Sequence, residues 1–117
     1  MQGIDKKQKL SWLNSNNSAH VFENRFSTGI VMRQGNTKRL RLTNSTAGFK
    51  AGTAYDLGTL PEGYRPMDQL VKFVVIAGNT DTAILGRLII STAGAVTFTP
   101  YADRGDGTVI NIDETYI

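Results

Sequence analysis

The segment from Leu60 to Pro66 constrains the fold more than any other part of this chain. It reads Leu-Pro-Glu-Gly-Tyr-Arg-Pro, with prolines five residues apart. Pro61 suits the second position of a type I turn and Gly63 its fourth. Leu60 and Arg65 each precede a proline and therefore favour extended backbone. One extended segment ends here, the chain turns sharply and another begins, which predicts a corner between strands in an all-β domain.

The clearest local element elsewhere is a β-hairpin. Two extended segments, 28–33 and 38–43, are joined by Gln-Gly-Asn-Thr, which supplies residues that tolerate positive φ. In the second segment two leucines alternate with two arginines. Because side chains alternate across a strand, this pattern predicts one buried face and one wet face.

Short extended segments separated by Gly- and Asn-rich turns continue along the chain, and no window shows an apolar repeat of 3.6 residues. The run from Leu70 to Ala77 is apolar at nearly every position and predicts a central strand packed on both faces. Gly86 indicates a bulge or a close approach of backbone. Further strands are expected at 10–13, 19–26, 55–60, 83–91, 95–99, 108–113 and 115–117.

Eight or so short strands predict an all-β fold, an antiparallel β-sandwich of jelly-roll-like form. A small α/β domain is the alternative, and the sequence lacks a helix to build it. Residues 1–9 are polar and predict a flexible lead-in or the end of an upstream linker. At 117 residues, the chain predicts a single β-sandwich domain over residues 10–117.

Composition excludes several classes of function. The chain has no cysteine, so it can form neither a disulfide nor a thiolate site. No apolar run approaches the roughly 18 residues of a membrane helix, and no secretion signal opens the chain. Residues 1–50 hold nine Lys and Arg against two acids, whereas residues 51–117 hold four against eight. A nucleic-acid reader needs its basic groups gathered on one face with aromatics among them. We instead read these groups as a solvated strand face and a basic linker, without a nucleic-acid partner.

An ordered set of motifs extends from Arg33 to Pro100. It contains Gly35-Asn36, then Ala51-Gly52, then the Leu60–Pro66 corner and its apolar strand. A strand containing Gly86 follows, and then Gly94-Ala-Val-Thr-Phe-Thr-Pro100. This order resembles a module common at the C-termini of tail-fibre, baseplate and receptor-binding proteins of tailed bacteriophages.

The resemblance implies a homotrimer of β-sandwiches at the tail tip of the virion, assembled in the bacterial cytoplasm. Its expected partners are other copies of itself, other tail or baseplate proteins, and a bacterial cell-wall or surface glycan. The match falls on corners and strands, so it bears on fold and context more than on a binding site. The alternative is a scaffold or decoration domain that binds only other virion proteins.

Saccharide binding requires an aromatic face for the C–H surface of the sugar and planar polar groups for its hydroxyls. Trp12, Tyr101, Asp103 and Arg104 have these side chains in or near loops, and they are the predicted saccharide-binding residues. Each also has a structural reading: Trp12 as a packing residue, and Asp103 with Arg104 as a surface ion pair. Anionic wall polymers would also favour three arginines if these faced outward: Arg33, Arg39 and Arg41.

Catalysis has little support in the sequence. His20 is the single histidine, and it lies in a polar region without a nucleophile motif. Asp103 and Asp106 are the types of residue that form a glycosidase pair, but their glycine-rich loop also suits turn-capping aspartates. The loop lacks the ligand spacing of an EF-hand. We therefore expect no catalytic residues, no metal site and no cofactor.

Overall fold

The computed structural model describes residues 17–23, 28–43, 48–77, 83–103 and 111–117. These segments form eight strands and no helix, hence no helix that could span a membrane. The strands are β1 (Asn17–Val21), β2 (Thr28–Gln34), β3 (Thr37–Thr43), β4 (Tyr55–Thr59), β5 (Leu70–Ala77), β6 (Ala83–Ile90), β7 (Ala95–Pro100) and β8 (Asn111–Tyr116).

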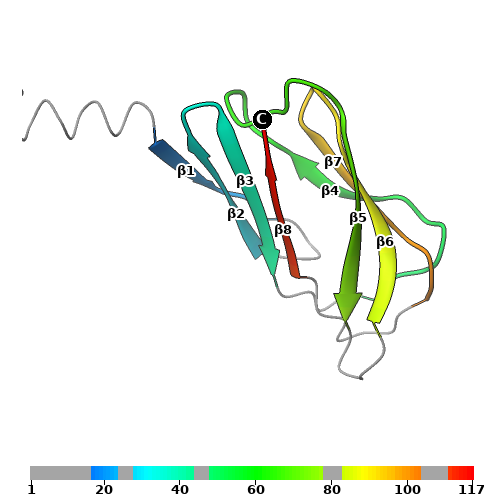
Figure 1. Ribbon diagram of the computed structural model, residues 1–117. Coiled ribbons are helices and arrows are strands. Elements are labelled where there is room, and N and C mark those ends of the chain that lie inside the picture. Colours follow the sequence, from blue (N-terminus) through cyan, green and yellow to red (C-terminus); the bar gives the residue numbers. More distant parts are fainter. Residues whose placement is uncertain (1–16, 24–27, 44–47, 78–82, 104–110) are drawn as a thin grey trace, which may run out of the picture.

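The strands form two four-stranded sheets that lie against each other (Figure 1). The first sheet has the order β1-β2-β3-β8 and the second the order β4-β7-β6-β5, and every pairing is antiparallel. The chain crosses from the first sheet to the second after β3 and returns after β7. The predicted all-β fold with two antiparallel sheets is confirmed.

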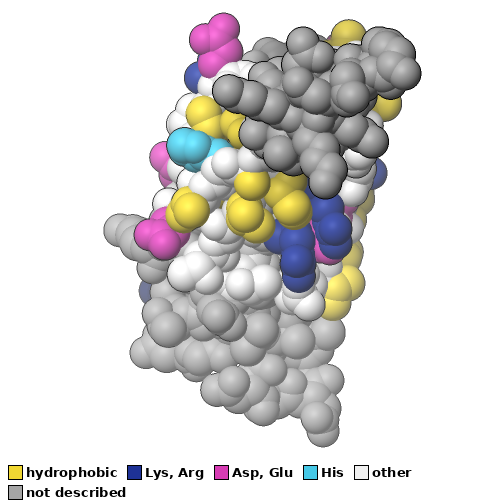
Figure 2. All heavy atoms as spheres, turned by 90° about the vertical axis from the view of Figure 1, so that its left-hand side faces the viewer, with side chains coloured by type: hydrophobic (Ala, Val, Ile, Leu, Met, Phe, Trp, Pro, Cys, Tyr) yellow, Lys and Arg dark blue, Asp and Glu magenta, His cyan; other side chains and the backbone are white. Residues whose placement is uncertain are grey.

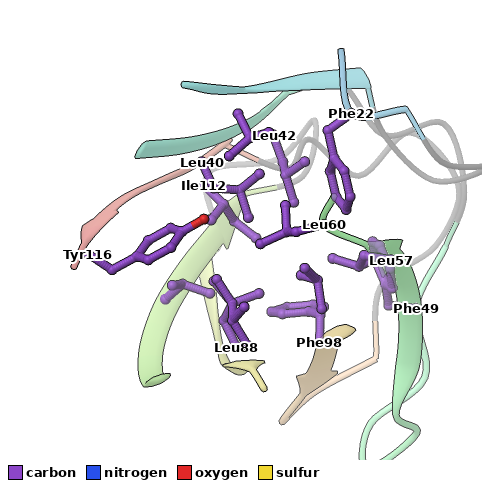
Figure 3. Packing of buried hydrophobic residues seen from close by; sticks show 14 residues of the cluster. Phe22, Leu40, Leu42, Phe49, Leu57, Leu60, Leu88, Phe98, Ile112 and Tyr116 are labelled. Carbon is purple, nitrogen blue, oxygen red and sulfur yellow. The ribbon is translucent and has the colours of Figure 1, made fainter. Parts of the chain in front are cut away.

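The core lies between the sheets and receives side chains from both. Figure 3 shows Leu40, Leu42 and Ile112 of the first sheet directed toward Leu88 and Phe98 of the second. All five are 0–1% exposed. Burial of a leucine- or phenylalanine-sized side chain contributes roughly 1.5–3 kcal/mol each, so this cluster provides the main attraction between the sheets.

The predicted hairpin is β2 and β3, with boundaries within one residue of those expected. Gly35 has φ +60° in the connecting turn. Leu40 and Leu42 are fully buried whereas Arg39 and Arg41 are exposed. The alternation of the sequence therefore assigned both faces of β3 correctly.

The prediction that Leu70–Ala77 is a central strand was wrong. β5 is an edge strand, bonded only to β6, and its other side lies beside β8 of the first sheet. Val74 is buried, but Val71, Phe73 and Val75 on the opposite face are 47–63% exposed. Apolar residues on both faces of a strand therefore do not by themselves place it at the centre of a sheet, because the pattern does not record which strands lie beside it.

Gly86 is a close-approach position and β6 has no bulge there, because the register with β5 is continuous from Leu70↔Ile90 to Ala77↔Ala83. A Cβ at Gly86 would overlap the ring of Phe98. The glycine therefore makes room for a buried aromatic ring of the adjacent strand β7.

The corner is present, with its turn one residue later than predicted. The amide of Tyr64 donates to the carbonyl of Pro61 at 3.1 Å, so the turn spans residues 61–64. Gly63 occupies the third position with φ +94°. Positive φ at the third position is typical of a type II turn, and only glycine adopts it without strain.

Hydrogen bonds attach the corner to the first sheet. The Tyr64 hydroxyl donates to Ser18 Oγ at 2.7 Å, and Arg33 donates to the carbonyl of Gly63 at 3.3 Å. The Tyr116 hydroxyl of β8 donates to the carbonyl of Tyr64 at 2.6 Å. Tyr64 is thus a packing residue that holds the corner across the inner side of β1, β2 and β8.

The stability of the fold at alkaline pH is expected to depend on the ionisation of Tyr116. Burial raises the pKa of its phenol from 10.0 to about 12. Between these values the unfolded chain releases the proton while the folded chain keeps it, so this contribution to stability is complete below pH 10.0 and is lost as pH rises towards about 12. Urea unfolding followed by circular dichroism should show stability falling more steeply with pH in the wild type than in Tyr116→Phe, by up to ~1.4 kcal/mol per pH unit. Equal slopes would contradict the assignment.

Candidate functional site

The predicted saccharide-binding residues do not come together among the described residues. Trp12 and Arg104 lie outside the described residues, as does Asp106 of the alternative carboxylate pair. Tyr101 is 49% exposed and lies beside Phe73, with ring centroids 6.4 Å apart. Asp103 is exposed, and its Oδ1 accepts a hydrogen bond from the amide of Ala51 at 2.8 Å. That bond connects the Asp103 side chain to the segment before β4, as expected for a loop-capping aspartate.

An open groove of about 610 Å³ lies along the first sheet. The strand register explains how it forms. Ala19, Met32, Arg39 and Thr115 are successive neighbours across β1, β2, β3 and β8, and Asn17, Gln34 and Thr37 form the next row. Directly opposite residues of antiparallel strands project on the same face. These two rows therefore line the groove on the side of the sheet that faces away from the core.

The lining of the groove combines apolar side chains, Ala19 and Met32, with planar polar ones, the amides of Asn17 and Gln34 and the guanidinium of Arg39. Figure 2, which views the molecule from the side of the first sheet, shows apolar side chains next to a group of Lys and Arg side chains. A volume of this size suits a ligand of a few sugar rings, and the amides can both donate to and accept from hydroxyls.

An ion pair fixes the cation at the border of this groove. Arg39 donates to both carboxylate oxygens of Asp113, from Nε at 2.7 Å and from Nη2 at 2.6 Å. Arg41 Nε lies 3.8 Å from the same carboxylate. The hydrogen bonds from Arg39 lower the pKa of Asp113, and Asp113 in turn raises the pKa of Arg39. A bidentate pair orients the planar guanidinium, so Arg39 has a defined position at this border.

The other basic candidates differ in position. Arg41 is exposed on the same face as Arg39, as anticipated for contact with an anionic polymer. Arg33 points inward instead, and its guanidinium carbon lies 5.9 Å from the centre of the Tyr64 ring. Sequence reasoning overlooked Asn17, Gln34 and Thr37, because their proximity depends on the pairing of β1 with β2 and of β2 with β3. Alternation along β2 and β3 could have indicated the last two.

A second surface feature lies on the outer side of the second sheet, and we call it the apolar face. It is formed by Val71, Phe73, Val75, Leu85 and Tyr101, which are 46–63% exposed. Val75 is opposite Leu85 in the register, and Phe73 is opposite Arg87, which is also exposed. The tyrosine proposed from the sequence as a sugar platform thus belongs to a largely aliphatic surface.

His20 lies beside the corner, with its ring 6.1 Å from that of Tyr64. In the described part of the chain, no three His, Cys, Asp or Glu side chains are grouped so that they could hold a metal ion. Comparison of the sequence with protein-family models and with curated proteins gave no match.

Proposed function

We propose that this protein is a non-catalytic host-adhesion domain of a phage tail tip, which binds a bacterial surface saccharide in the groove of the first sheet. The ordered motifs from Arg33 to Pro100 support the virion context. The observation that carries the ligand class is the groove, which is lined by amide and guanidinium side chains together with apolar ones. Sugars bind through many hydrogen bonds to planar polar groups, and this lining supplies them without a catalytic base or nucleophile.

The proposal includes a homotrimer with a jelly-roll-like arrangement. The order of the second sheet is compatible with this arrangement, because β5, β6 and β7 are consecutive neighbours and β4 lies beside β7, as in a Greek key, while β1, β2 and β3 follow one another as a simple meander. Three copies around an axis would cover surfaces that one small sandwich leaves exposed.

Binding to glycans and to wall material from a panel of bacterial strains tests the function. Once a glycan is found, isothermal titration calorimetry of Gln34→Ala and Arg39→Gln should each show about a tenfold loss of affinity. Gln34→Ala removes one hydrogen bond to the sugar, and Arg39→Gln removes a charge-assisted one. Lys50→Gln is the matched control for charge, because Lys50 is exposed and does not line the groove. It should bind as the wild type does.

Two outcomes would contradict this assignment. If no wall material is bound, the adhesion function fails. If Tyr101→Ala abolishes binding while Gln34→Ala does not, the saccharide site lies on the apolar face, where Phe73 and Tyr101 provide two neighbouring rings.

The second candidate function is a scaffold or decoration domain of the tail or baseplate, with protein partners only. The specific observation in its favour is the apolar face, because Val and Leu side chains offer no hydrogen bonds to a sugar. Absence of glycan binding, together with burial of the apolar face in an assembly of virion proteins, would support this candidate.

A further inference from the structure

We infer that copies of this chain associate through the apolar face of the second sheet. The inference rests on the proposed homotrimer for its stoichiometry and on the described residues for its location. Of the eight large hydrophobic side chains exposed in the described part of the chain, five belong to this face. They come from β5, β6 and the residue after β7, which are hydrogen-bonded neighbours in one sheet.

The register makes the five residues one continuous surface. Leu85 is opposite Val75 on β5, and its carbonyl accepts a hydrogen bond from the amide of Tyr101 at 2.9 Å. Phe73 lies two residues from both Val71 and Val75 on the same side of β5, and its ring meets that of Tyr101. The five side chains therefore form a patch and are not scattered single residues.

The size of the patch matches the centre of a stable interface. An aromatic side chain has an accessible area of about 150–250 Å², so Phe73 and Tyr101 alone expose on the order of 200 Å². With the aliphatic residues the total is about 300–600 Å², the size of the largest apolar patch on a typical monomer, which is often a functional surface. A standard interface buries about 800 Å² per partner, in which such a patch forms the apolar core.

The position of the patch on β5 also indicates protein cover. β5 is an edge strand with three exposed apolar residues and no charge on its outer side in the described positions. The charged residue of this strand, Lys72, alternates with these three residues and so lies on the opposite side, toward the first sheet. The outer side is therefore apolar at all three positions, and contiguous exposed apolar surface of this kind is typical of a site that a protein partner covers.

Charge complementarity favours a second copy of the chain as that partner. Arg87, opposite Phe73, is exposed and forms no ion pair with any described residue. The same outer side of the sheet also carries an exposed carboxylate, Asp56 on β4, paired in register with Thr97 of β7. One surface thus carries a cation on the inner strand β6 and an anion on the edge strand β4. Copies related by a rotation axis can place Arg87 of one against Asp56 of the next.

Sedimentation velocity or light scattering at micromolar concentrations tests this surface. We expect the wild type to be trimeric and Phe73→Asp to weaken association about 30-fold or more, as for a central aromatic contact. Val21→Asp is the matched control, because Val21 is 64% exposed against 63% for Phe73 and lies on the first sheet. Val21→Asp should remain trimeric. Circular dichroism checks that each variant is folded, and Val75→Lys provides a second disruption of the same face.

A charge exchange gives an independent readout. Arg87→Asp should weaken association, and the addition of Asp56→Arg should restore it if the two residues meet between copies. A trimeric wild type in which Phe73→Asp and Val75→Lys remain trimeric would overturn this surface and leave the proposed trimer intact. A monomeric wild type would overturn both, while the saccharide titrations would still test adhesion separately.

Discussion

Replacing Phe98 by alanine is expected to lower the free energy of unfolding by about 3–5 kcal/mol. Phe98 is fully buried, and its ring meets the edge of Phe49 with centroids 5.6 Å apart. Gly86 lies against the same ring from β6. Truncation would therefore leave a cavity where the sheets meet, in a protein whose total stability is of the order of 5–15 kcal/mol. Urea unfolding at one fixed protein concentration would measure the change, because association also shifts apparent stability.

The pairing of Phe98 with Gly86 provides the control for this prediction. Gly86→Ala should destabilise the wild type by about 1–3 kcal/mol, since the added methyl group overlaps the ring. In the Phe98→Ala background the same change should cost little, because the ring is gone. Met67→Ala, at a side chain 71% exposed, should change stability by no more than about 0.5 kcal/mol. If the losses of stability caused by Gly86→Ala and Phe98→Ala were additive, they would contradict a contact between Gly86 and the Phe98 ring.

Gly94→Ala is expected to destabilise the fold by about 3 kcal/mol, the combined effect of backbone strain and a steric clash. Gly94 has φ +90°, and a Cβ there would lie 2.7 Å from the carbonyl oxygen of Leu60. The carbonyl of Gly94 accepts a hydrogen bond from the amide of Leu60 at 2.8 Å, and this bond joins the corner to the turn before β7. A methyl group would thus separate the two segments that this bond connects. Chemical denaturation followed by far-UV circular dichroism would measure the loss of stability.

Gly52→Ala separates the two causes. Gly52 also has positive φ, +74°, but nothing lies within 4 Å of the position of its Cβ. The substitution Gly52→Ala should therefore lower the free energy of unfolding only by the strain of a left-handed backbone, about 1–2 kcal/mol. The difference between the two substitutions measures the close approach at the corner. If both substitutions cost the same, the close approach of Gly94 to the Leu60 carbonyl adds no steric penalty.

Local chemistry made part of this fold predictable. The Gly-Asn loop and the Leu/Arg alternation located the β2–β3 hairpin and both its faces, because turn geometry and side-chain alternation act within a few residues. The prolines placed the corner correctly, although the turn itself is one residue later. The exact position of the turn depends on the hydrogen bonds of Tyr64 with Ser18 and β8. These partners are distant in the chain, so no local pattern predicts them.

The candidate site was less predictable. Arg39 was identified as a residue for an anionic or polar ligand, and the alternation of β3 correctly indicated that it faces outward. Its bidentate partner Asp113 lies 74 residues further along the chain, and the two meet only because β8 pairs with β3. Tyr101 was singled out as an aromatic near a loop. Its neighbour Phe73 comes from another strand, and together they belong to an apolar surface that no single segment displays.

Local sequence patterns were sufficient to predict that this protein is all-β, that β2 and β3 form a hairpin with one buried face, and that the chain turns at Leu60–Pro66. Each of these depends on backbone preferences and alternation within one short segment. The position of the apolar strand β5 at an edge, and the meeting of Asn17, Gln34 and Arg39 in one groove, became visible in the folded chain alone. Both features depend on which strands pair although they are far apart in the chain. That pairing is set by the apolar area that the two sheets bury together, and no single segment determines this area.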